Sequence, residues 1–183
     1  MKNNTLKVQS GFLKGKILKQ PSLVSTRATK SIVKACVFNV LRDDLKDYVF
    51  IEAFGGSASM AIEAISNYAK KSYAIELDKD AFNCAKDNVK GLNIDLFNGD
   101  TFDILPKIIS NINEKAILYL DPPFDIRDGF CDIYKKIIEL YEKLNCEIMI
   151  IEHSSKVVFN SEKYTLFKVK KFGNTTLSFF KKS

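Results

Sequence analysis

The sequence predicts an α/β fold: a mostly parallel sheet of seven strands, helices on both faces, and a β-hairpin at the C-terminus. From residue 48 onward, short apolar runs alternate with segments of helical periodicity, and this alternation is typical of a parallel sheet with crossover helices. The strand-like runs are apolar at successive positions, which indicates burial on both sides. The last segment has two strand-like halves around Gly173 and Asn174, which favours a hairpin.

The predicted elements follow one another with short connections. Strands are expected at 48–54, 71–78, 94–100, 115–121 and 146–153, helices at 59–69, 79–89, 101–110 and 128–144, and the hairpin at 164–182. The apolar side of the first of these helices is expected to hold Met60, Ala61, Ala64, Ile65 and Tyr68.

The region before residue 48 differs from the rest. Residues 6–21 could form a small basic hairpin, and residues 28–44 have the pattern of a helix. The apolar side of that helix is expected to hold Ile32, Val33, Val37, Val40 and Leu41. We predict a basic N-terminal extension over 1–42, facing a partner, on a main domain over 43–183.

Charge is distributed unevenly along the chain. Residues 1–42 have nine basic and no acidic side chains, residues 43–155 have 12 − 21 = −9, and residues 156–183 have 7 − 1 = +6, which together give the net charge of +6. Lys and Arg at phosphates dominate the affinity for nucleic acids. The two basic ends therefore predict a surface for a polyanion.

Composition excludes several classes of protein. With 46% apolar and 27% charged residues, the chain has the composition of an ordinary soluble domain, and no apolar run is long enough to span a membrane. The opening "MKNNTLK" has no apolar core of a secretory signal, so a cytoplasmic location is expected. The four cysteines are widely spaced and His153 is the one histidine, so we expect neither disulfides nor a metal site.

Ligands of open α/β sheets lie beyond the carboxyl ends of the strands. After the first strand, "EAFGGSAS" (52–59) has two glycines that let the backbone turn tightly, and a helix that begins near Ser57 would favour an anionic group there. The loop matches neither the phosphate-binding G-x-x-x-x-G-K-[ST] nor the hydrolase G-x-S-x-G.

Acids stand at the next two strand ends. Glu76, about twenty residues past the glycines, could accept hydrogen bonds from ribose hydroxyls. Asp78 is a second candidate, or it caps the following helix. Asp100 could accept a hydrogen bond from an adenine amino group or simply cap the helix that starts at Thr101.

The fourth strand ends in "LYLDPPFD" (118–125). Proline has a fixed φ and no N–H, so two prolines end the strand in a stiff turn beside Asp121. A stiff turn that keeps a carboxylate and a phenyl ring at a central strand end indicates a bound planar partner.

The glycine loop together with "DPPF" resembles the S-adenosylmethionine-dependent methyltransferases that modify exocyclic amino groups of bases. The whole chain is similar, more narrowly, to the bacterial 16S ribosomal-RNA guanine-N2 methyltransferases of the RsmD type. This resemblance rests on "GFLKGKIL", "FNVL", "FGGSASMAIEAIS", "AIELD", "LDPPF" and "FGNTTLSFF", in that order. It implies a Rossmann-like class I methyltransferase fold and S-adenosylmethionine as cofactor.

The resemblance also implies roles for individual residues. Asp121 and the carbonyl of Pro122 would accept hydrogen bonds from the target amine, and Phe124 would stack on the base. Cofactor contacts are implied for Glu52, Phe54, Gly55, Gly56, Glu76, Leu77, Asp100 and Asp121, and RNA contacts for Lys14, Lys16, Arg27 and Thr29. The expected partner is ribosomal RNA, within the small subunit or an assembly intermediate, and the expected state is a monomer.

The chain departs from the family pattern in two places. Ala58 replaces the second glycine of the usual Gly-Ser-Gly, and we expect it to be tolerated as a helical residue. The usual Arg-Pro-Thr-Thr-Asp is Arg27-Ala28-Thr29-Lys30-Ser31, and Ala35 replaces an acid. The second set falls in the part that faces the substrate.

Three alternatives stay open. The same motif serves adenine-N6 methyltransferases of DNA or RNA, although 183 residues leave little room for a DNA-recognition domain. The chain could also be a non-catalytic RNA-binding protein on a methyltransferase fold, a possibility that the intact "DPPF" disfavours. A Rossmann dehydrogenase is disfavoured by the lack of G-x-G-x-x-G.

Overall fold

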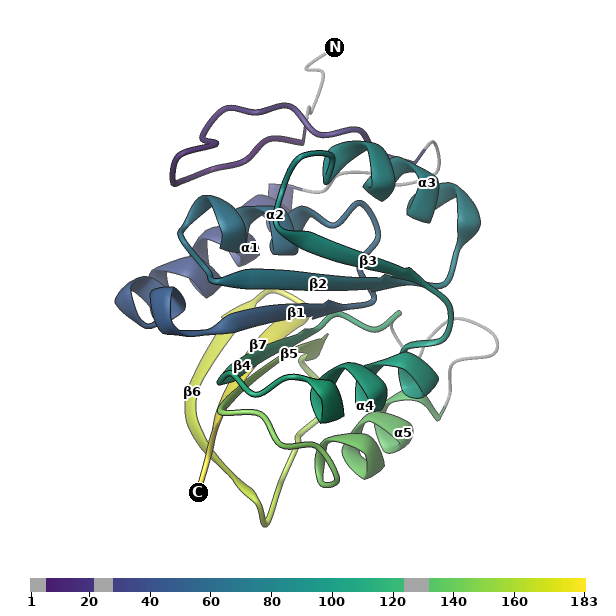
Figure 1. The fold of residues 1–183 in the computed structure, drawn as a ribbon. Helices are drawn as coiled ribbons and strands as arrows, with labels where there is room; N and C mark the ends of the chain where they lie inside the picture. Colours follow the sequence, from purple (N-terminus) through teal and green to yellow (C-terminus); the bar gives the residue numbers. More distant parts are fainter. Residues whose placement is uncertain (1–5, 22–27, 124–131) are drawn as a thin grey trace.

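The computed structural model describes residues 6–21, 28–123 and 132–183, except for the side chains of residues 28–30 and 43–44. Its seven strands form one sheet in the order β3-β2-β1-β4-β5-β7-β6 (Figure 1). The strands are β1 (Val49–Ala53), β2 (Lys71–Glu76), β3 (Ile94–Asn98), β4 (Ala116–Leu120), β5 (Ile148–Ser154), β6 (Tyr164–Phe172) and β7 (Thr175–Lys182). The first five are parallel, and β6 and β7 form an antiparallel hairpin at one edge. The predicted fold class is confirmed.

Helices cover both faces of this sheet. α1 (Ala28–Leu41), α2 (Ser59–Ser66) and α3 (Lys79–Asn88) lie on one face, and α4 (Thr101–Asn111) and α5 (Ile133–Tyr141) lie on the other (Figure 1). A short 3-10 helix, Arg42–Asp47, joins α1 to β1. All five residues of β1 and of β4 are buried. The continuous apolar pattern of these strands therefore has the predicted cause, helices on both sides.

Two helices begin with the predicted aspartate caps. The side chain of Asp78 accepts a hydrogen bond from the backbone N–H of Ala81 at 2.8 Å, and that of Asp100 accepts one from Phe102 at 2.8 Å. Each cap satisfies a backbone donor that has no partner within the helix. Asp78 and Asp100 are thus helix caps. The predicted contact of Asp100 with an adenine amino group is a separate question.

Two predicted apolar positions are exposed. α2 ends at Ser66 instead of residue 69, and Tyr68 beyond it is 59% exposed. Its ring lies 5.8 Å from that of Phe12, in the N-terminal segment, instead of in the core. Ile32 is 56% exposed, and its side chain lines a surface hollow between α1 and β6.

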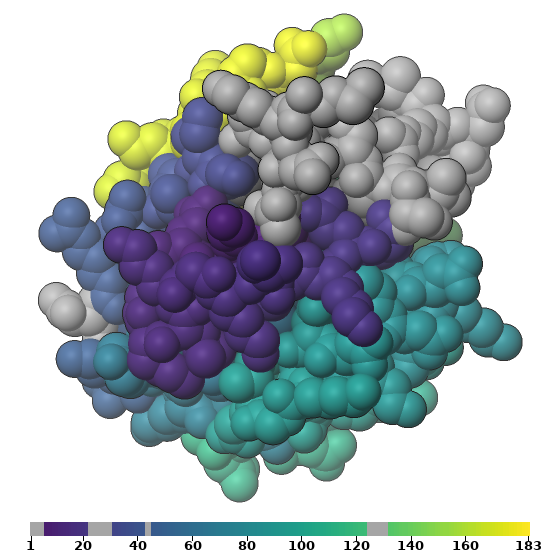
Figure 2. Space-filling model, turned by 90° about the horizontal axis from the view of Figure 1, so that it is seen from above, coloured from purple at the N-terminus to yellow at the C-terminus, as the bar shows by residue number. Residues whose placement is uncertain are grey.

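The N-terminal segment, residues 6–21, folds back on itself. Lys7 and Ile17 form a single antiparallel bridge, which is less than the regular hairpin predicted. Val8 and Leu18 are buried in one apolar cluster with residues of α2 and α3. In the view from above, the segment (purple) lies on the side of the molecule that carries α1 and α3 (Figure 2). The division of the chain at residue 42 stays a prediction.

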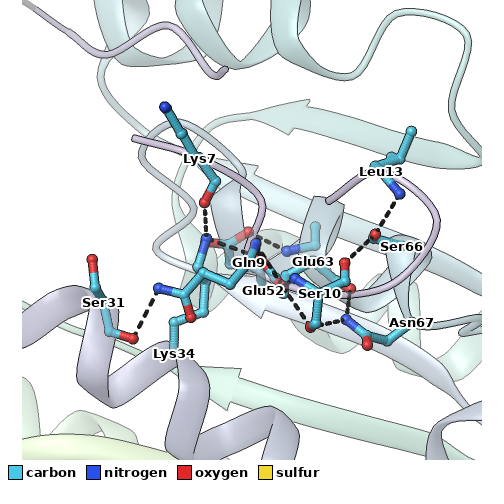
Figure 3. A network of polar contacts seen from close by, with 11 residues as sticks. Lys7, Gln9, Ser10, Leu13, Ser31, Lys34, Glu52, Glu63, Ser66 and Asn67 are labelled. Atoms are coloured by element: carbon cyan, nitrogen blue, oxygen red, sulfur yellow. Dashed lines mark hydrogen bonds and ion pairs between the residues drawn. The ribbon is translucent and has the colours of Figure 1, made fainter. Parts of the chain in front are cut away.

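A buried polar network holds this segment to α2 (Figure 3). Glu63 is 1% exposed. Its carboxylate accepts hydrogen bonds from the backbone N–H groups of Gln9 and Ser10 and from the Ser10 hydroxyl. It also pairs with Lys34 of α1 at 3.0 Å. Ser66 accepts a hydrogen bond from the N–H of Leu13. Two segments more than fifty residues apart in sequence thus share one network.

We predict that Gly11→Ala strongly destabilises the docked segment. Gly11 has φ +76°, and a Cβ there would lie 1.8 Å from the backbone oxygen of Ser66. Gly15 has φ +90°, but a Cβ there would meet nothing within 4 Å. Gly15→Ala should therefore lose only about 1 kcal/mol of unfolding free energy, from backbone strain. Gly11→Ala adds a clash with backbone and should lose about 3 kcal/mol.

Urea denaturation of both variants measures the difference. The glycine-to-alanine change and the positive φ are common to the two positions, so only the contact with Ser66 separates them. Equal losses would contradict the docked position of the segment.

Candidate active site

The glycine loop after β1 closes onto the end of β2. The N–H of Gly55 donates to the Ile75 carbonyl at 2.6 Å, and a Cβ on Gly55 would lie 3.2 Å from that oxygen. The N–H of Gly56 donates to the Glu76 carboxylate at 2.6 Å. The backbone therefore turns tightly and approaches β2 closely at these two glycines, as the sequence predicted.

Residues on both sides of these glycines have left-handed backbone. Phe54 has φ 68° and Ala58 has φ 60°. Such conformations are costly for residues with a Cβ and are concentrated at functional sites. The expectation that Ala58 is helical is wrong: it is the residue before α2, at φ 60° and ψ 31°, where glycine would be unstrained. The Phe54 ring packs edge-on against Phe102 of α4.

Glu76 organises the edge of the loop. One carboxylate oxygen accepts from Gly56 and the other accepts from the N–H of Asp78 at 2.7 Å. An ionised carboxylate has about four lone-pair sites, so further donors could bind. Leu77, next to it, is 68% exposed, and Asp100 is also exposed at the next strand end.

Glu52 is a buried acid below the loop. It is 4% exposed and accepts a hydrogen bond from the N–H of Ala61, in the first turn of α2, at 2.8 Å. Burial raises the pKa of Glu52 from 4.5 to about 8, and the charge of Asp121 acts in the same direction. The N–H groups of Ala61 and Met60 and the charge of Lys34 lower the pKa but do not offset burial. Near neutral pH, this carboxyl is therefore largely protonated in the free protein.

Asp121 lies beside the glycine loop. β1 and β4 are neighbours, and Ala53 pairs with Leu120 in the last row of their register. The loop from Phe54 and the turn from Asp121 thus leave the sheet next to each other. Asp121 is half-buried and Pro122 is buried. Phe124, the predicted stacking ring, lies outside the described residues.

Tyr119 and Glu152 belong to the same cluster, and sequence reasoning missed both. The Tyr119 hydroxyl donates to the Glu152 carboxylate at 2.6 Å, and both residues are buried. Burial, together with the charges of Glu152, Asp121 and Glu52, raises the pKa of Tyr119 well above 10, so the hydroxyl keeps its proton. The available signal was "IIEH", an acid at the end of the fifth strand.

Two of the four predicted RNA contacts, Lys14 and Lys16, lie in the N-terminal segment. Lys14 is exposed at the tip of the N-terminal segment, and the Lys16 ammonium donates to the Asn88 carbonyl at 3.3 Å. Arg27 and the side chain of Thr29 lie outside the described part of the chain. Of the two described lysines, Lys16 is connected to the glycine loop through Asn88, whose side-chain amide donates to the Ser57 carbonyl at 3.1 Å.

Within the described ranges, no group of three or more His, Cys, Asp or Glu side chains is arranged to hold a metal ion. No helix of that part of the chain is long and apolar enough to cross a membrane. Cys36, Cys84 and Cys146 are free thiols.

Comparison with known proteins identifies the family. The model of the family described as "Conserved hypothetical protein 95" matches residues 6–181. Ribosomal RNA small subunit methyltransferase D of Buchnera aphidicola is 30% identical over 92% of this chain and 89% of that protein. The chain belongs to the RsmD-type methyltransferase family. The putative rRNA methyltransferase YlbH of Bacillus subtilis, 26% identical, covers 97% of this chain and is itself covered to 99%.

Solved structures show the same fold as this RsmD-type chain. The putative methyltransferase yhhF of Escherichia coli has a TM-score of 0.81 at 22% identity, with 98% of each chain covered. The putative methylase HI0767 of Haemophilus influenzae has a TM-score of 0.77 at 25% identity, with 97% of this chain and 98% of that chain covered. The class I methyltransferase fold that the resemblance implied is therefore confirmed.

Proposed function

We propose that the protein transfers a methyl group from S-adenosylmethionine to the exocyclic N2 of a guanine in 16S ribosomal RNA. One observation carries the proposal: the glycine loop and the Asp121–Pro122 turn leave adjacent parallel strands in register. This arrangement supports the proposal that the loop binds the nucleoside of the cofactor beside two hydrogen-bond acceptors for an amine. Methyl transfer needs these two sites to be neighbours.

The polar groups of the site fit S-adenosylmethionine. A buried carboxyl at Glu52 suits the amino end, the Gly55–Gly56 turn, where the backbone can approach a ligand closely, suits the carboxylate side, and Glu76 suits the ribose hydroxyls. The exposed Leu77 offers an apolar surface to the adenine ring, and Asp100 an acceptor to its amino group. The bound cofactor would supply a methyl group already activated on a positively charged sulfur. Glu52, Asp121 and Glu152 give the cluster acidic character, which favours a cation.

The residues of this chain would activate the amine. An exocyclic amine shares its lone pair with the purine ring and is a weak nucleophile. Asp121 and the Pro122 carbonyl would accept its two N–H groups, localise the lone pair and stabilise the positive charge that develops on nitrogen. The stiff proline turn keeps these acceptors in place, because a displacement of about 1 Å can cost on the order of a hundredfold in rate.

The substrate class follows from the relatives and the charge pattern. Several of the relatives are named as ribosomal RNA small subunit methyltransferases, and both ends of this chain are basic. A base inside a duplex is out of reach, so the target would lie in a loop or be flipped out. We propose a cytoplasmic monomer that acts on the small subunit or its assembly intermediate.

Methyl-labelled S-adenosylmethionine tests the proposal. The protein is offered unmethylated small ribosomal subunits, naked ribosomal RNA and duplex DNA, and labelled nucleosides are identified after digestion. Label in N2-methylguanosine from ribosomal material is expected. Label in N6-methyladenosine would replace the substrate, and bound cofactor without any label would favour a non-catalytic RNA-binding protein.

We predict that S-adenosylmethionine binds more tightly as the pH rises from 6 to 7. A cationic ligand favours the ionised form of Glu52, whose pKa of about 8 means that the free protein holds a proton there. Binding must then release about one proton, so the Kd should fall by up to about tenfold per pH unit below pH 8. Calorimetry in buffers of different ionisation enthalpy measures both the Kd and the proton release.

Glu52→Gln is the matched control. The amide keeps an oxygen that can accept from Ala61 but has no proton to release. This variant should bind S-adenosylmethionine more weakly than the wild type at pH 7, and its Kd should change little between pH 6 and 7. The titration of the ligand's own amino group is common to both proteins. An equal pH dependence in the two proteins would exclude Glu52 as the titrating group.

A further inference from the structure

The molecule has a surface hollow away from the glycine loop, between α1 and the edge strand β6. Its volume is about 490 Å³, and its walls include Ile32 and Arg42 from the α1 side and Lys168, Lys170 and Phe172 from β6. β6 is the last strand of the sheet, so the hollow is open along one side. The C-terminal strands (yellow) lie beside α1 (blue) in the view from above (Figure 2).

The hollow is basic. Arg42, Lys168 and Lys170 contribute three positive charges, and none of the described residues that line it is acidic. Lys168 and Lys170 line the hollow opposite Cys36 of α1, and their charges lower the pKa of the Cys36 thiol against the effect of its burial. Cations with no acids between them suit a polyanion.

Apolar surface lies between these cations. Ile32 is 56% exposed, and Phe172, the last residue of β6, is partly buried. A duplex would present only phosphates and sugars to such a wall, whereas a single strand can also place its bases against apolar and aromatic side chains. The combination therefore favours single-stranded nucleic acid.

The hollow is in line with the proposed catalytic edge along one row of the sheet. Lys170 pairs with Leu177 of β7, and Leu177 pairs with Glu152 of β5. β5 is next to β4, where Leu120 pairs with Ile151, one residue before Asp121 and Glu152. Lys170 thus lies three strands from Asp121 on the same row of the sheet, about 14 Å away at roughly 4.8 Å per strand.

We infer that the hollow between α1 and β6 is a track for the single-stranded RNA that flanks the target base. This inference rests on the proposed function for the nature of the RNA. Lysines on an edge strand also prevent edge-to-edge pairing of sheets. Charges of either sign would prevent edge-to-edge pairing, whereas binding to phosphate needs positive charge. Replacing the lysines by glutamates therefore separates the two roles.

The test is the affinity of Lys168→Glu/Lys170→Glu for a fluorescein-labelled, mixed-sequence single-stranded RNA of about twelve nucleotides, measured by anisotropy over a range of salt. The matched control is Lys86→Glu/Lys107→Glu, which makes the same change of charge at exposed positions of α3 and α4. Losing two phosphate contacts should lower the slope of log K against log salt by about 1.4, at roughly 0.7 per contact. The affinity should fall about tenfold or more relative to the control.

Two further measurements sharpen the result. Ile32→Ala should weaken binding without changing the salt slope, and an RNA duplex of equal length should compete poorly. Lys168→Glu/Lys170→Glu should stay monomeric like its control, since the edge strand β6 still has charged side chains. Equal affinity and slope in the two double variants would overturn the inference. Because anisotropy needs no methyl transfer, a failure of the proposed reaction would leave this result unaffected.

Discussion

Asp121→Ala is expected to lower the rate of methyl transfer by about a hundredfold to a thousandfold. Removing one preorganised group that stabilises developing charge has an effect of that size in other enzymes. The carboxylate stands at the end of β4, directly beside the glycine loop of β1, and Pro122 restricts its backbone. The cofactor's Kd should change far less than the rate, because the main effect falls on the acceptor amine. Single-turnover transfer from labelled cofactor measures the rate, and calorimetry measures the Kd.

Two controls accompany this variant. Asp121→Asn keeps one oxygen acceptor but removes the charge, so its rate should lie between those of wild type and Asp121→Ala. Asp95→Ala removes an acid that pairs with Lys71 on the surface, away from the loop, and should keep the wild-type rate. A full rate in Asp121→Ala would contradict the proposed mechanism.

The sequence predicted the parts of the fold and site that depend on local pattern. Continuous apolar strands such as "AILYL" are buried on both faces as expected, and acids followed by helix starts are caps at Asp78 and Asp100. Glu76 and Asp121 became candidates from one rule, that ligands lie at the carboxyl ends of parallel strands, and Glu52 became one from the family resemblance. That rule applied equally to Glu152, which a complete survey of strand ends would have included.

The remaining features depend on contacts that the local sequence does not encode. Helical periodicity gives no reason to bury Glu63, which is buried because residues 9 and 10 and Lys34 supply its partners. Ala58 fits a helix by composition, but the turn that brings Gly55 and Gly56 against β2 forces φ 60° on it. Ile32 fits the apolar stripe of α1, but the edge hairpin leaves it at an open hollow.

Glu63→Ala is expected to lower the free energy of unfolding by about 3–5 kcal/mol. Breaking a buried ion pair by removing one partner leaves the other charge buried without compensation. Here the charge left behind is that of Lys34, 3% exposed, whose ammonium would keep its hydrogen bond to the Lys7 carbonyl at 2.9 Å. The N–H groups of Gln9 and Ser10 would also lose their acceptor. Since typical domains unfold with 5–15 kcal/mol, this loss is a large fraction of the total.

Urea denaturation gives the loss, and Glu139→Ala is the matched control. Glu139 is an exposed acid within α5, so its replacement should change the unfolding free energy by less than about 0.5 kcal/mol. Lys34→Met/Glu63→Leu removes both charges and should recover part of the loss, because an apolar pair avoids the desolvation of an unpaired ion. A loss below 1 kcal/mol in Glu63→Ala would mean that the N-terminal segment is not held by this network.

The effect should extend from stability to the proposed active site. Glu63 lies two residues after Ala61, whose N–H binds Glu52, so one turn of α2 joins the N-terminal segment to the acid below the glycine loop (Figure 3). If the segment undocks in Glu63→Ala, trypsin should cleave sooner near the exposed Lys14, and the pH dependence of cofactor binding assigned to Glu52 should weaken in parallel. Faster cleavage with unchanged cofactor binding would instead show that α2 keeps its position without the segment.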